Sequence, residues 1–398
     1  MKVLVADKLP PSGISGLEAA GYDVLNEPGL ADGALVERVR ETGAQVLVVR
    51  STKVPRPVLE AGALGLVIRA GAGVNTIDVE AASELGIYVA NCPGKNAIAV
   101  AELAFGLALA LDRRLVDCTQ ELRAGRWDKK GFGKARGLYG RTLGVIGTGE
   151  IGRQVARRGK AFGMRVIAWS RSLTPEKAAE WKLERRERPE DVAREADVVS
   201  VHVAQTGETK GFLGERFFAA MRPGTLFVNT ARGGVVDPDA LRKAITDGGV
   251  RAGLDVWSQQ PAEAQGAFED PLGQLEGVYG THHIGASTDQ AQDAVADEAV
   301  RIARLYREQG EVPNCVNVCA KSPAACALVV RHLDRVGVLA HVLEQLKGAE
   351  TNVQEMENVI FEGAKAACAT IRVDREPAAE LLDRLRGHEH VLSITVAR

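Results

Sequence analysis

Three closely spaced glycines in the middle of the chain constrain its fold more than any other feature. They are Gly147, Gly149 and Gly152, in the run TLGVIGTGEIG over residues 142–152. The first glycine permits a tight turn, the second lets the backbone approach a pyrophosphate, and the third allows a helix to pack closely on a strand. The bound anion then lies at the helix N-terminus, where unpaired N–H groups point toward it. The run predicts a dinucleotide site.

The residues around the glycines favour this interpretation over a glycine turn without a ligand. Residues 143–146 form an apolar run typical of a buried parallel strand, and apolar residues then repeat at helical spacing up to Phe162. A second strand is expected at residues 165–170. Strand, glycine turn, helix and strand in this order are the context that the motif requires.

Length and composition indicate a globular protein of two or three domains. The chain has 398 residues, 45% of them hydrophobic and 26% charged, with a net charge of −2. This balance gives no reason to expect nucleic acid or a membrane as partner. The N-terminal apolar run is too short for a signal segment, and the longest apolar stretch, residues 97–111, contains Glu102 and is too short for a bilayer. We expect a cytoplasmic protein.

The six cysteines are scattered, without the paired spacing of a zinc site. We therefore expect reduced thiols and no metal.

Strands and helices alternate on both sides of the glycine run. Strands are expected at residues 3–6, 46–50, 67–70 and 88–90 before it, and at 165–170, 198–202, 225–229, 252–255 and 278–280 after it. This alternation predicts an α/β protein with two doubly wound, Rossmann-like parallel sheets. A helical pattern over residues 289–309 is long enough to return to the first sheet.

These patterns predict the domain boundaries. We expect a discontinuous substrate-binding domain, residues 1–98 and 286–312, with a dinucleotide-binding domain inserted at residues 99–285. A small substrate would bind between the two. A linker with prolines near both ends follows at residues 313–323. Residues 324–398 then read strand, helix, strand, strand, helix, strand, which predicts a ferredoxin-like βαββαβ domain.

Two residues that follow predicted strands suggest chemistry. Arg232 lies in the run NTARGG at the carboxyl edge of a strand, where it can hold a carboxylate with two parallel hydrogen bonds. His283 lies in the run THHIGAST, and a histidine can take a hydroxyl proton while hydride leaves the same carbon. A single histidine is more often structural, but the three features together favour a dehydrogenase site.

The chain resembles the D-isomer-specific 2-hydroxyacid dehydrogenases, and among them most closely the D-3-phosphoglycerate dehydrogenases. The motifs that carry the resemblance are RAGAGVNTIDV (69–79), NCPGKNAIAVAEL (91–103), GTGEIG (147–152), NTARGGVVD (229–237), AGLDVW (252–257) and HHIGAST (282–288). The resemblance implies that Arg232 grips the substrate carboxylate, His283 is the acid and base, and Asp255 orients the nicotinamide. It also implies that further residues line the cofactor: Ala72, Glu150, Ile151, Thr230, Ala231, Gly285 and Ala286.

The chain departs from this family at the residue before Pro261. The family normally has a glutamate there, paired with the catalytic histidine, whereas this chain has Gln260. A glutamine carbonyl can still orient an imidazole but carries no charge, so the neutral histidine is favoured. We expect activity to survive with its pH profile displaced toward acid. Glu263 could substitute for the missing carboxylate, although a solvated loop residue is the simpler interpretation.

A second departure concerns the cofactor. An acidic residue at the end of the strand after the glycine run normally binds the ribose 2′-hydroxyl, and Ser170 stands there instead, followed by Arg171. A hydroxyl beside a guanidinium suits a 2′-phosphate, since no carboxylate repels it. Alternatively, Arg171 points to solvent. The choice between NAD, the family default, and NADP stays open.

The resemblance also implies contacts for a phosphorylated substrate. These are Arg50, Ser51, Arg69, Gly73 and Asn96, with Ala72 beside them. Lys129 and Lys130 match a basic stretch that can reach across a dimer, or else belong to an exposed loop.

The C-terminal domain resembles ACT regulatory domains through the run HLDRVGVL, residues 332–339. His332 and Asn352 match residues that hold L-serine in serine-sensitive relatives, whereas Asp334 replaces an asparagine. Feedback inhibition by L-serine and a role in oligomerisation alone are both open. A homodimer or homotetramer is expected from the resemblance.

Three functions therefore remain from the sequence. The first is a D-3-phosphoglycerate dehydrogenase that opens L-serine biosynthesis, and the second is an NADPH-dependent hydroxypyruvate or glyoxylate reductase. The third is a nucleotide-sensing binding protein on a dehydrogenase fold, which only Gln260 supports.

Overall fold

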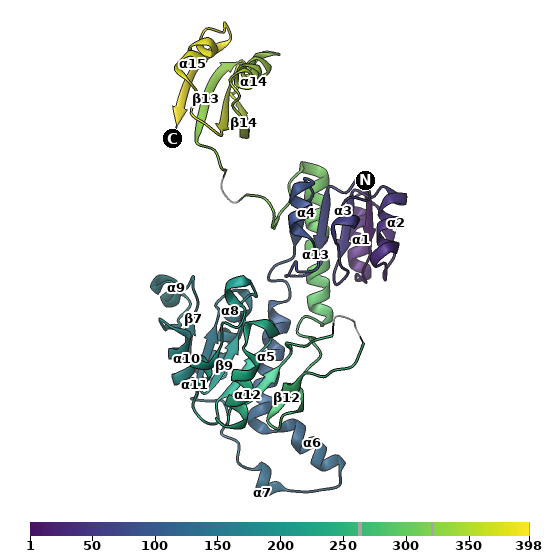
Figure 1. The fold of residues 1–398 in the computed structure, drawn as a ribbon, viewed down its shortest axis with the longest axis vertical. Helices are drawn as coiled ribbons and strands as arrows, with labels where there is room; N and C mark the ends of the chain where they lie inside the picture. The colour runs from purple at the N-terminus through teal and green to yellow at the C-terminus, as the bar shows by residue number, and fades with distance from the viewer. Residues whose placement is uncertain (262–264, 320–321, 398) are drawn as a thin grey trace. The chain divides into compact units, whose positions relative to one another are not determined.

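The computed structural model describes residues 1–261, 265–319 and 322–397. The chain forms two compact units, Met1–Val316 and Asn317–Arg398 (Figure 1). The first unit contains two parallel sheets covered by helices, and the second contains one antiparallel sheet, which confirms the predicted fold class. Among the described residues, no helix has both the length and the apolar character needed to cross a membrane.

The first sheet is parallel and has the strand order β2-β1-β3-β4-β5. Its strands are β1 (Lys2–Val5), β2 (Asp23–Asn26), β3 (Val46–Val49), β4 (Leu66–Arg69) and β5 (Tyr88–Asn91). Its connecting helices are α1 (Pro11–Ala19), α2 (Asp32–Thr42), α3 (Arg56–Leu59) and α4 (Val79–Glu84). Strand β2 is not among the strands predicted above, because this edge strand has only partly buried or exposed residues and no continuous apolar run.

Helix α13 (Asp289–Gln309) returns the chain to the first sheet. Its residues Ala299, Ile302 and Ala303 are buried in one core with Val3 and Ile68 of the sheet. Thr288 caps its first turn, and Gly310, in the left-handed conformation, ends it. The first domain is therefore discontinuous, and this helix has the bounds that its sequence pattern predicts.

The second sheet is parallel and has the order β12-β11-β10-β9-β6-β7-β8. Its strands are β6 (Thr142–Ile146), β7 (Arg165–Trp169), β8 (Glu184–Arg185), β9 (Val198–Val201), β10 (Leu226–Asn229), β11 (Arg251–Leu254) and β12 (Val278–Gly280). The α-helices of this part of the chain are α5 (Ala97–Arg113), α6 (Leu115–Arg123), α7 (Lys129–Phe132), α8 (Glu150–Ala161), α9 (Pro175–Glu180), α10 (Pro189–Glu195), α11 (Glu215–Ala219) and α12 (Pro238–Thr246). Three short 3-10 helices are η1 (Gly207–Thr209), η2 (Gly233–Val235) and η3 (Pro271–Gln274).

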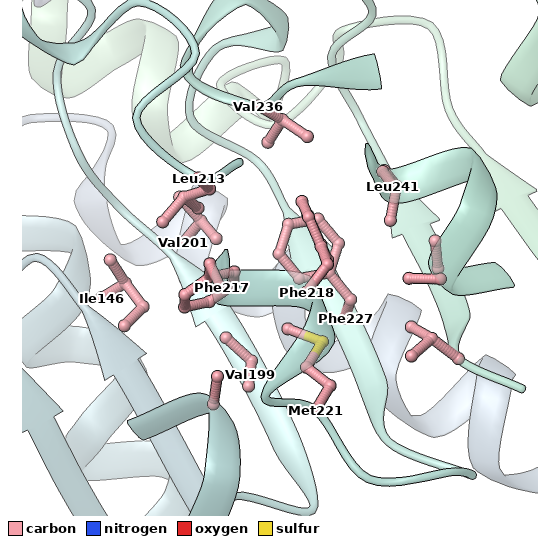
Figure 2. Close-up of a cluster of buried hydrophobic side chains, with 14 of the residues drawn as sticks. Ile146, Val199, Val201, Leu213, Phe217, Phe218, Met221, Phe227, Val236 and Leu241 are labelled. Atoms are coloured by element: carbon pink, nitrogen blue, oxygen red, sulfur yellow. The ribbon is translucent and has the colours of Figure 1, made fainter. Parts of the chain in front are cut away.

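Buried aromatic side chains fix α11 on this sheet. Phe217 and Phe218 of α11 lie beside Phe227 of β10, as Figure 2 shows, and the rings of Phe218 and Phe227 meet edge to face with centroids 5.2 Å apart. On the other face, α5 and α8 share a core with β6, β9 and β10. The sheet is thus covered on both sides, as a parallel sheet requires.

The strand order reverses beside β6, which lies between β7 and β9. Ligands of doubly wound sheets bind outside the carboxyl ends of the strands at such a reversal. The glycine run follows β6 directly, so it lies at this position.

The second unit is a four-stranded antiparallel sheet with two helices. Its elements are β13 (Cys326–Leu333), α14 (Val338–Gly348), β14 (Val353–Ile360), β15 (Ala366–Val373), α15 (Ala379–Arg386) and β16 (Val391–Ala397). The order β14-β15-β13-β16 is that of a ferredoxin-like fold. Helix α14 begins at Val338, directly after Gly337, which has a φ of 91° in the left-handed conformation.

The chain leaves the first unit later than the sequence pattern suggested. Cys315 pairs with Ala90, and the backbone N–H of Val316 donates to the carbonyl of Val89 at 2.8 Å. The first part of the expected linker therefore lies along β5 as part of the first unit.

Candidate active site

The glycine turn after β6 leaves space for an anion. A Cβ atom at Gly147, where φ is 93°, would lie 2.5 Å from the carbonyl oxygen of His202, and one at Gly152 would lie 2.0 Å from that of Gly147. Both positions therefore require glycine. A Cβ built at Gly149, which precedes α8, would meet no atom of the described residues within 4 Å apart from its chain neighbours. A tight turn and open space at a helix N-terminus fit a pyrophosphate.

The end of β7 carries no carboxylate. Ser170 and Ser172 have their hydroxyl oxygens 3.5 Å apart, and Nη1 of Arg171 lies 2.5 Å from Oε2 of Glu208. Both partners of that ion pair are exposed. Such pairs contribute little to stability, so the guanidinium of Arg171 can exchange Glu208 for another anion.

His283 lies in a loop that a single buried carboxylate holds. Asp255, at the end of β11, accepts hydrogen bonds from the Thr281 hydroxyl at 2.6 Å and from the backbone N–H groups of Ile284 at 2.8 Å and Gly285 at 2.9 Å. Between these anchors, His283 has a φ of 55°, which residues other than glycine seldom adopt. Asp255 therefore fixes the backbone around His283, a contribution that sequence patterns did not indicate.

Gln260 contacts His283 directly. Its Oε1 lies 3.0 Å and its Nε2 2.8 Å from Nδ1 of the imidazole. The amide can therefore accept a hydrogen bond from Nδ1–H or donate one to an unprotonated Nδ1, whereas a carboxylate can only accept. Glu263, the proposed substitute, lies outside the described residues.

The surroundings of His283 favour its neutral form. Partial burial of the ring is the largest effect that lowers its pKa, and the positive charges of Arg232 and Arg69 lower it further. The charge of Asp255 opposes them, but the net pKa lies below the ordinary value for histidine. At neutral pH the imidazole is thus ready to accept a proton.

Arg232 follows β10 and reaches toward the first domain. Asn229 holds its loop, since its Nδ2 donates to the Arg232 carbonyl at 3.0 Å and its Oδ1 accepts from Ala231 N–H at 3.0 Å. A Cβ built at Gly73 would lie 3.0 Å from Nη2 of Arg232, so a larger residue at Gly73 would crowd the guanidinium.

Arg50, Arg69 and Arg232 form a cationic cluster. Burial is the main effect that lowers the pKa of Arg69, and the charges of Arg232 and Arg50 add to it. Nε of Arg69 is buried without a hydrogen-bond partner, whereas Nη1 of Arg50 donates to Oε1 of Gln292 at 3.2 Å. Within the described ranges, none of the three arginines makes an ion pair with a carboxylate. Uncompensated guanidinium groups suit a ligand with more than one negative charge.

At the carboxyl edge of the second sheet, two buried polar atoms have no hydrogen-bond partner among the described residues. They are Nδ1 of His202 and Oγ1 of Thr230, whose residues are adjacent because Val201 pairs with Asn229. His202, which the sequence analysis did not single out, has Nε2 2.8 Å from the Ser200 hydroxyl, and burial lowers its pKa to about 3.

The remaining predicted residues lie as follows. The Ala72 carbonyl accepts from Asn91 Nδ2 at 2.6 Å, Asn96 has a buried Oδ1 without a partner, and Glu150 pairs with Arg153. Ile151 follows in the first turn of α8, and Gly285 and Ala286 continue the His283 loop. Lys129 and Lys130 are exposed on α7.

The three predicted effector residues do not form one site within a chain. His332 pairs with Ala367 at one end of β15, whereas Val353, next to Asn352, pairs with Val373 at the other end. His332 is buried, with Nδ1 donating to the Leu333 carbonyl at 2.7 Å and Nε2 3.3 Å from Oδ1 of Asn358. Asp334 and Asn352 are exposed.

Known proteins share this architecture. Residues 105–285 match the family model described as D-isomer specific 2-hydroxyacid dehydrogenase, NAD binding domain. The D-3-phosphoglycerate dehydrogenase of Methanocaldococcus jannaschii is 42% identical over 76% of this chain, which spans 58% of that protein's length. The glyoxylate reductase of Thermococcus litoralis is 37% identical over 81% of this chain and 99% of the reductase.

Solved structures agree with these matches. The NAD+-bound 3-phosphoglycerate dehydrogenase of Entamoeba histolytica aligns with 80% of this chain and 99% of its own, at 26% identity and a TM-score of 0.66. The TT0316 protein of Thermus thermophilus aligns with 79% of this chain and 100% of its own, at 34% identity and a TM-score of 0.70.

Proposed function

Because the chain belongs to the D-isomer specific 2-hydroxyacid dehydrogenases, we propose that it oxidises the C2 hydroxyl of D-3-phosphoglycerate, the reaction that opens L-serine biosynthesis. One observation carries the choice of substrate: Arg69 and Arg232 lie near His283, Arg50 lies near Arg69, and none of the three has a carboxylate partner in the described chain. A substrate with both a carboxylate and a phosphate would supply the missing negative charges.

The residues take distinct roles in this reaction. Arg232 binds the substrate carboxylate through two N–H groups, which fixes C2 relative to the imidazole. His283, neutral at pH 7, removes the proton of the C2 hydroxyl, while Gln260 orients the ring through Nδ1. NAD or NADP, when bound at the glycine turn, supplies the acceptor for the hydride. Arg50 and Arg69 hold the phosphate.

Initial rates test the proposal directly. The chain should form reduced cofactor from D-3-phosphoglycerate, with NAD or NADP, at a rate that depends on enzyme concentration. Absence of turnover with both cofactors, alongside rapid reduction of hydroxypyruvate or glyoxylate, would overturn it.

A hydroxypyruvate or glyoxylate reductase that uses NADPH is the second candidate. The Ser170–Arg171 pair favours it, and proteins named glyoxylate reductase and hydroxypyruvate reductase are 37% and 42% identical. Such small substrates, however, would leave Arg50 and Arg69 without an anion. The third candidate, a nucleotide-sensing binding protein, is weaker because Arg232 and His283 lie close enough for their charges to interact.

The partners and domains follow from the same proposal. The substrate-binding and dinucleotide-binding domains would divide near residues 98 and 285, and the second unit would act as an ACT-like domain. We propose a homo-oligomer, since α6 has no buried residue and Leu115, Leu122 and Trp127 are 51%, 52% and 81% exposed. A serine site built from His332, Asp334 and Asn352 would need residues from two copies.

Replacing Gln260 with glutamate should shift the pH profile. A carboxylate beside Nδ1 would raise the pKa of His283, typically by about one unit or more. Oxidation requires neutral His283, so the acid limb of the pH profile for oxidation should move toward higher pH. Reduction requires protonated His283, so its kcat/KM should stay high up to a higher pH than in the parent chain. The measurement is kcat/KM against pH in both directions.

Gln259→Glu is the matched control for this change. It adds the same charge one residue away, on a residue whose backbone N–H donates to Asp270 at 3.0 Å. We expect its profile to follow the parent chain. Superimposable profiles for the parent and Gln260→Glu would contradict the assigned contact.

Cofactor preference should depend on Ser170 and Arg171. Ser170→Asp should lower kcat/KM with NADP by about tenfold or more, because the new carboxylate repels the 2′-phosphate. Arg171→Ala should lower kcat/KM with NADP and leave kcat/KM with NAD within about twofold of the parent value. Steady-state kinetics with both cofactors measure this. Equal losses of kcat/KM with NAD and NADP in Arg171→Ala would mean that Arg171 only forms its surface ion pair with Glu208 and does not bind the 2′-phosphate.

A further inference from the structure

The carboxylate of Asp7 is enclosed by the loop that carries Arg50. Asp7 directly follows β1, and its Oδ2 accepts the backbone N–H groups of Arg50 at 2.6 Å, Ser51 at 3.1 Å and Thr52 at 3.0 Å. Its Oδ1 accepts the Ser51 hydroxyl at 2.9 Å. One carboxylate thus binds every residue from Arg50 to Thr52.

These hydrogen bonds keep Asp7 ionised. Burial by itself would raise its pKa, but the bonds from Arg50, Thr52 and Ser51 outweigh burial and the net pKa lies below the ordinary value. The same charge acts on Arg69, where it opposes the dominant effect of burial on that guanidinium. Asp7 therefore lies beside the cationic cluster without pairing with any of its guanidinium groups.

The backbone N–H groups of residues 50–52 are consequently occupied, so a ligand can bind to the side chains of this loop but not to its backbone donors. The N–H groups of Arg50, Ser51 and Thr52 are turned onto Asp7, and the Arg50 guanidinium is steadied by Gln292 at 3.2 Å. The position of that guanidinium thus depends on the loop conformation that Asp7 imposes.

We infer that Asp7 is a positioning residue that sets the preference for phosphorylated over unphosphorylated 2-hydroxy acids. It acts by fixing the loop so that Arg50 meets the phosphate end of the substrate, while Arg232 and His283 act on the other end. The inference rests on the proposed function.

Positioning and simple electrostatics predict opposite effects for Asp7→Asn. Loss of a negative charge near three arginines would by itself strengthen anion binding. An amide oxygen in the place of Oδ2, however, accepts the three backbone N–H groups more weakly than a charged carboxylate does, and the NH2 group replaces the acceptor of the Ser51 hydroxyl, so the loop would be held less firmly. A lower kcat/KM for the phosphorylated substrate in Asp7→Asn therefore indicates that Asp7 positions the loop. A higher kcat/KM indicates that Asp7 acts through its charge alone.

The experiment compares kcat/KM for D-3-phosphoglycerate and D-glycerate in Asp7→Asn, Ser51→Ala and the parent chain. Asp7→Asn should lower the value for D-3-phosphoglycerate about tenfold or more, and that for D-glycerate at most about twofold. Ser51→Ala removes the hydrogen bond from the Ser51 hydroxyl to Asp7. It should lower kcat/KM for D-3-phosphoglycerate by less than Asp7→Asn does, and it should again affect D-glycerate less than D-3-phosphoglycerate. Equal losses on both substrates, or a gain on D-3-phosphoglycerate, would overturn the inference.

Asp78→Asn is the matched control. Asp78 lies in the same domain and caps α4 by accepting the Ala81 N–H at 3.0 Å, so the change removes a similar contact away from the Arg50 loop. Its selectivity should equal that of the parent chain. If Asp7→Asn fails to fold, Asp7→Glu replaces it, because the longer side chain keeps the charge but moves the carboxylate away from the N–H groups of the loop, and unchanged selectivity in it would refute the inference.

A separate measurement keeps the two proposals distinguishable. If the parent chain reduces hydroxypyruvate but does not oxidise D-3-phosphoglycerate, the proposed function fails. The inhibition of hydroxypyruvate reduction by D-3-phosphoglycerate then reports on the loop. Asp7→Asn should raise that inhibition constant about tenfold, and an unchanged constant would reject the role of Asp7.

Discussion

Replacing His283 with alanine is expected to lower kcat for D-3-phosphoglycerate oxidation about 10³-fold. The imidazole is the group that accepts the hydroxyl proton in this account, and its lowered pKa keeps it unprotonated at neutral pH. Cofactor binding should survive, because the glycine turn lies on a different loop. Steady-state rates, together with cofactor titration by fluorescence, measure both effects.

His282→Ala provides the control, since His282 is the adjacent histidine in the same loop and is also exposed. Its activity should stay within about twofold of the parent chain. A similar loss in both variants would mean that the loop conformation held by Asp255, rather than proton transfer, had been disturbed.

Arg232→Lys should lower kcat/KM for D-3-phosphoglycerate about 100-fold, mainly through KM. Lysine keeps the positive charge but cannot bind a carboxylate with two parallel N–H groups. Nη2 of Arg232 also lies 3.0 Å from the point where a Cβ of residue 73 would stand, and because Gly73 has no side chain, the smaller head group of lysine would leave a gap there. Arg242→Lys, on an exposed residue paired with Asp239 at 3.1 Å, is the control and should have no effect. Full activity in Arg232→Lys would contradict the proposed carboxylate contact.

Sequence patterns predicted the elements whose features are local. The glycine run, the helix Asp289–Gln309 and the C-terminal βαββαβ order each follow from short stretches of residues. Arg232 and His283 were predicted to act together because both follow strands of one parallel sheet, whose carboxyl ends meet at one edge. The contact of Gln260 with His283 was also predicted, and it is present.

What the sequence could not predict depends on contacts between distant segments. Asp7 and Arg50 are separated by 43 positions, and nothing near either residue indicates that one binds the backbone of the other. Thr281 and Asp255 meet only because two loops converge beside β11 and β12. In the second unit, the strand register places His332 and Asn352 at opposite ends of β15, and the sequence of each strand does not specify this register.

In the proposed reaction, the cationic cluster of Arg50, Arg69 and Arg232 selects a phosphorylated 2-hydroxy acid. The most direct measurement is the ratio of kcat/KM for D-3-phosphoglycerate to that for D-glycerate, under identical conditions and with the better of NAD and NADP. We expect a ratio of about 100 or more, since two guanidinium contacts to phosphate are each worth about 1.5 kcal/mol or more. A ratio near one, or a preference for D-glycerate, would contradict it.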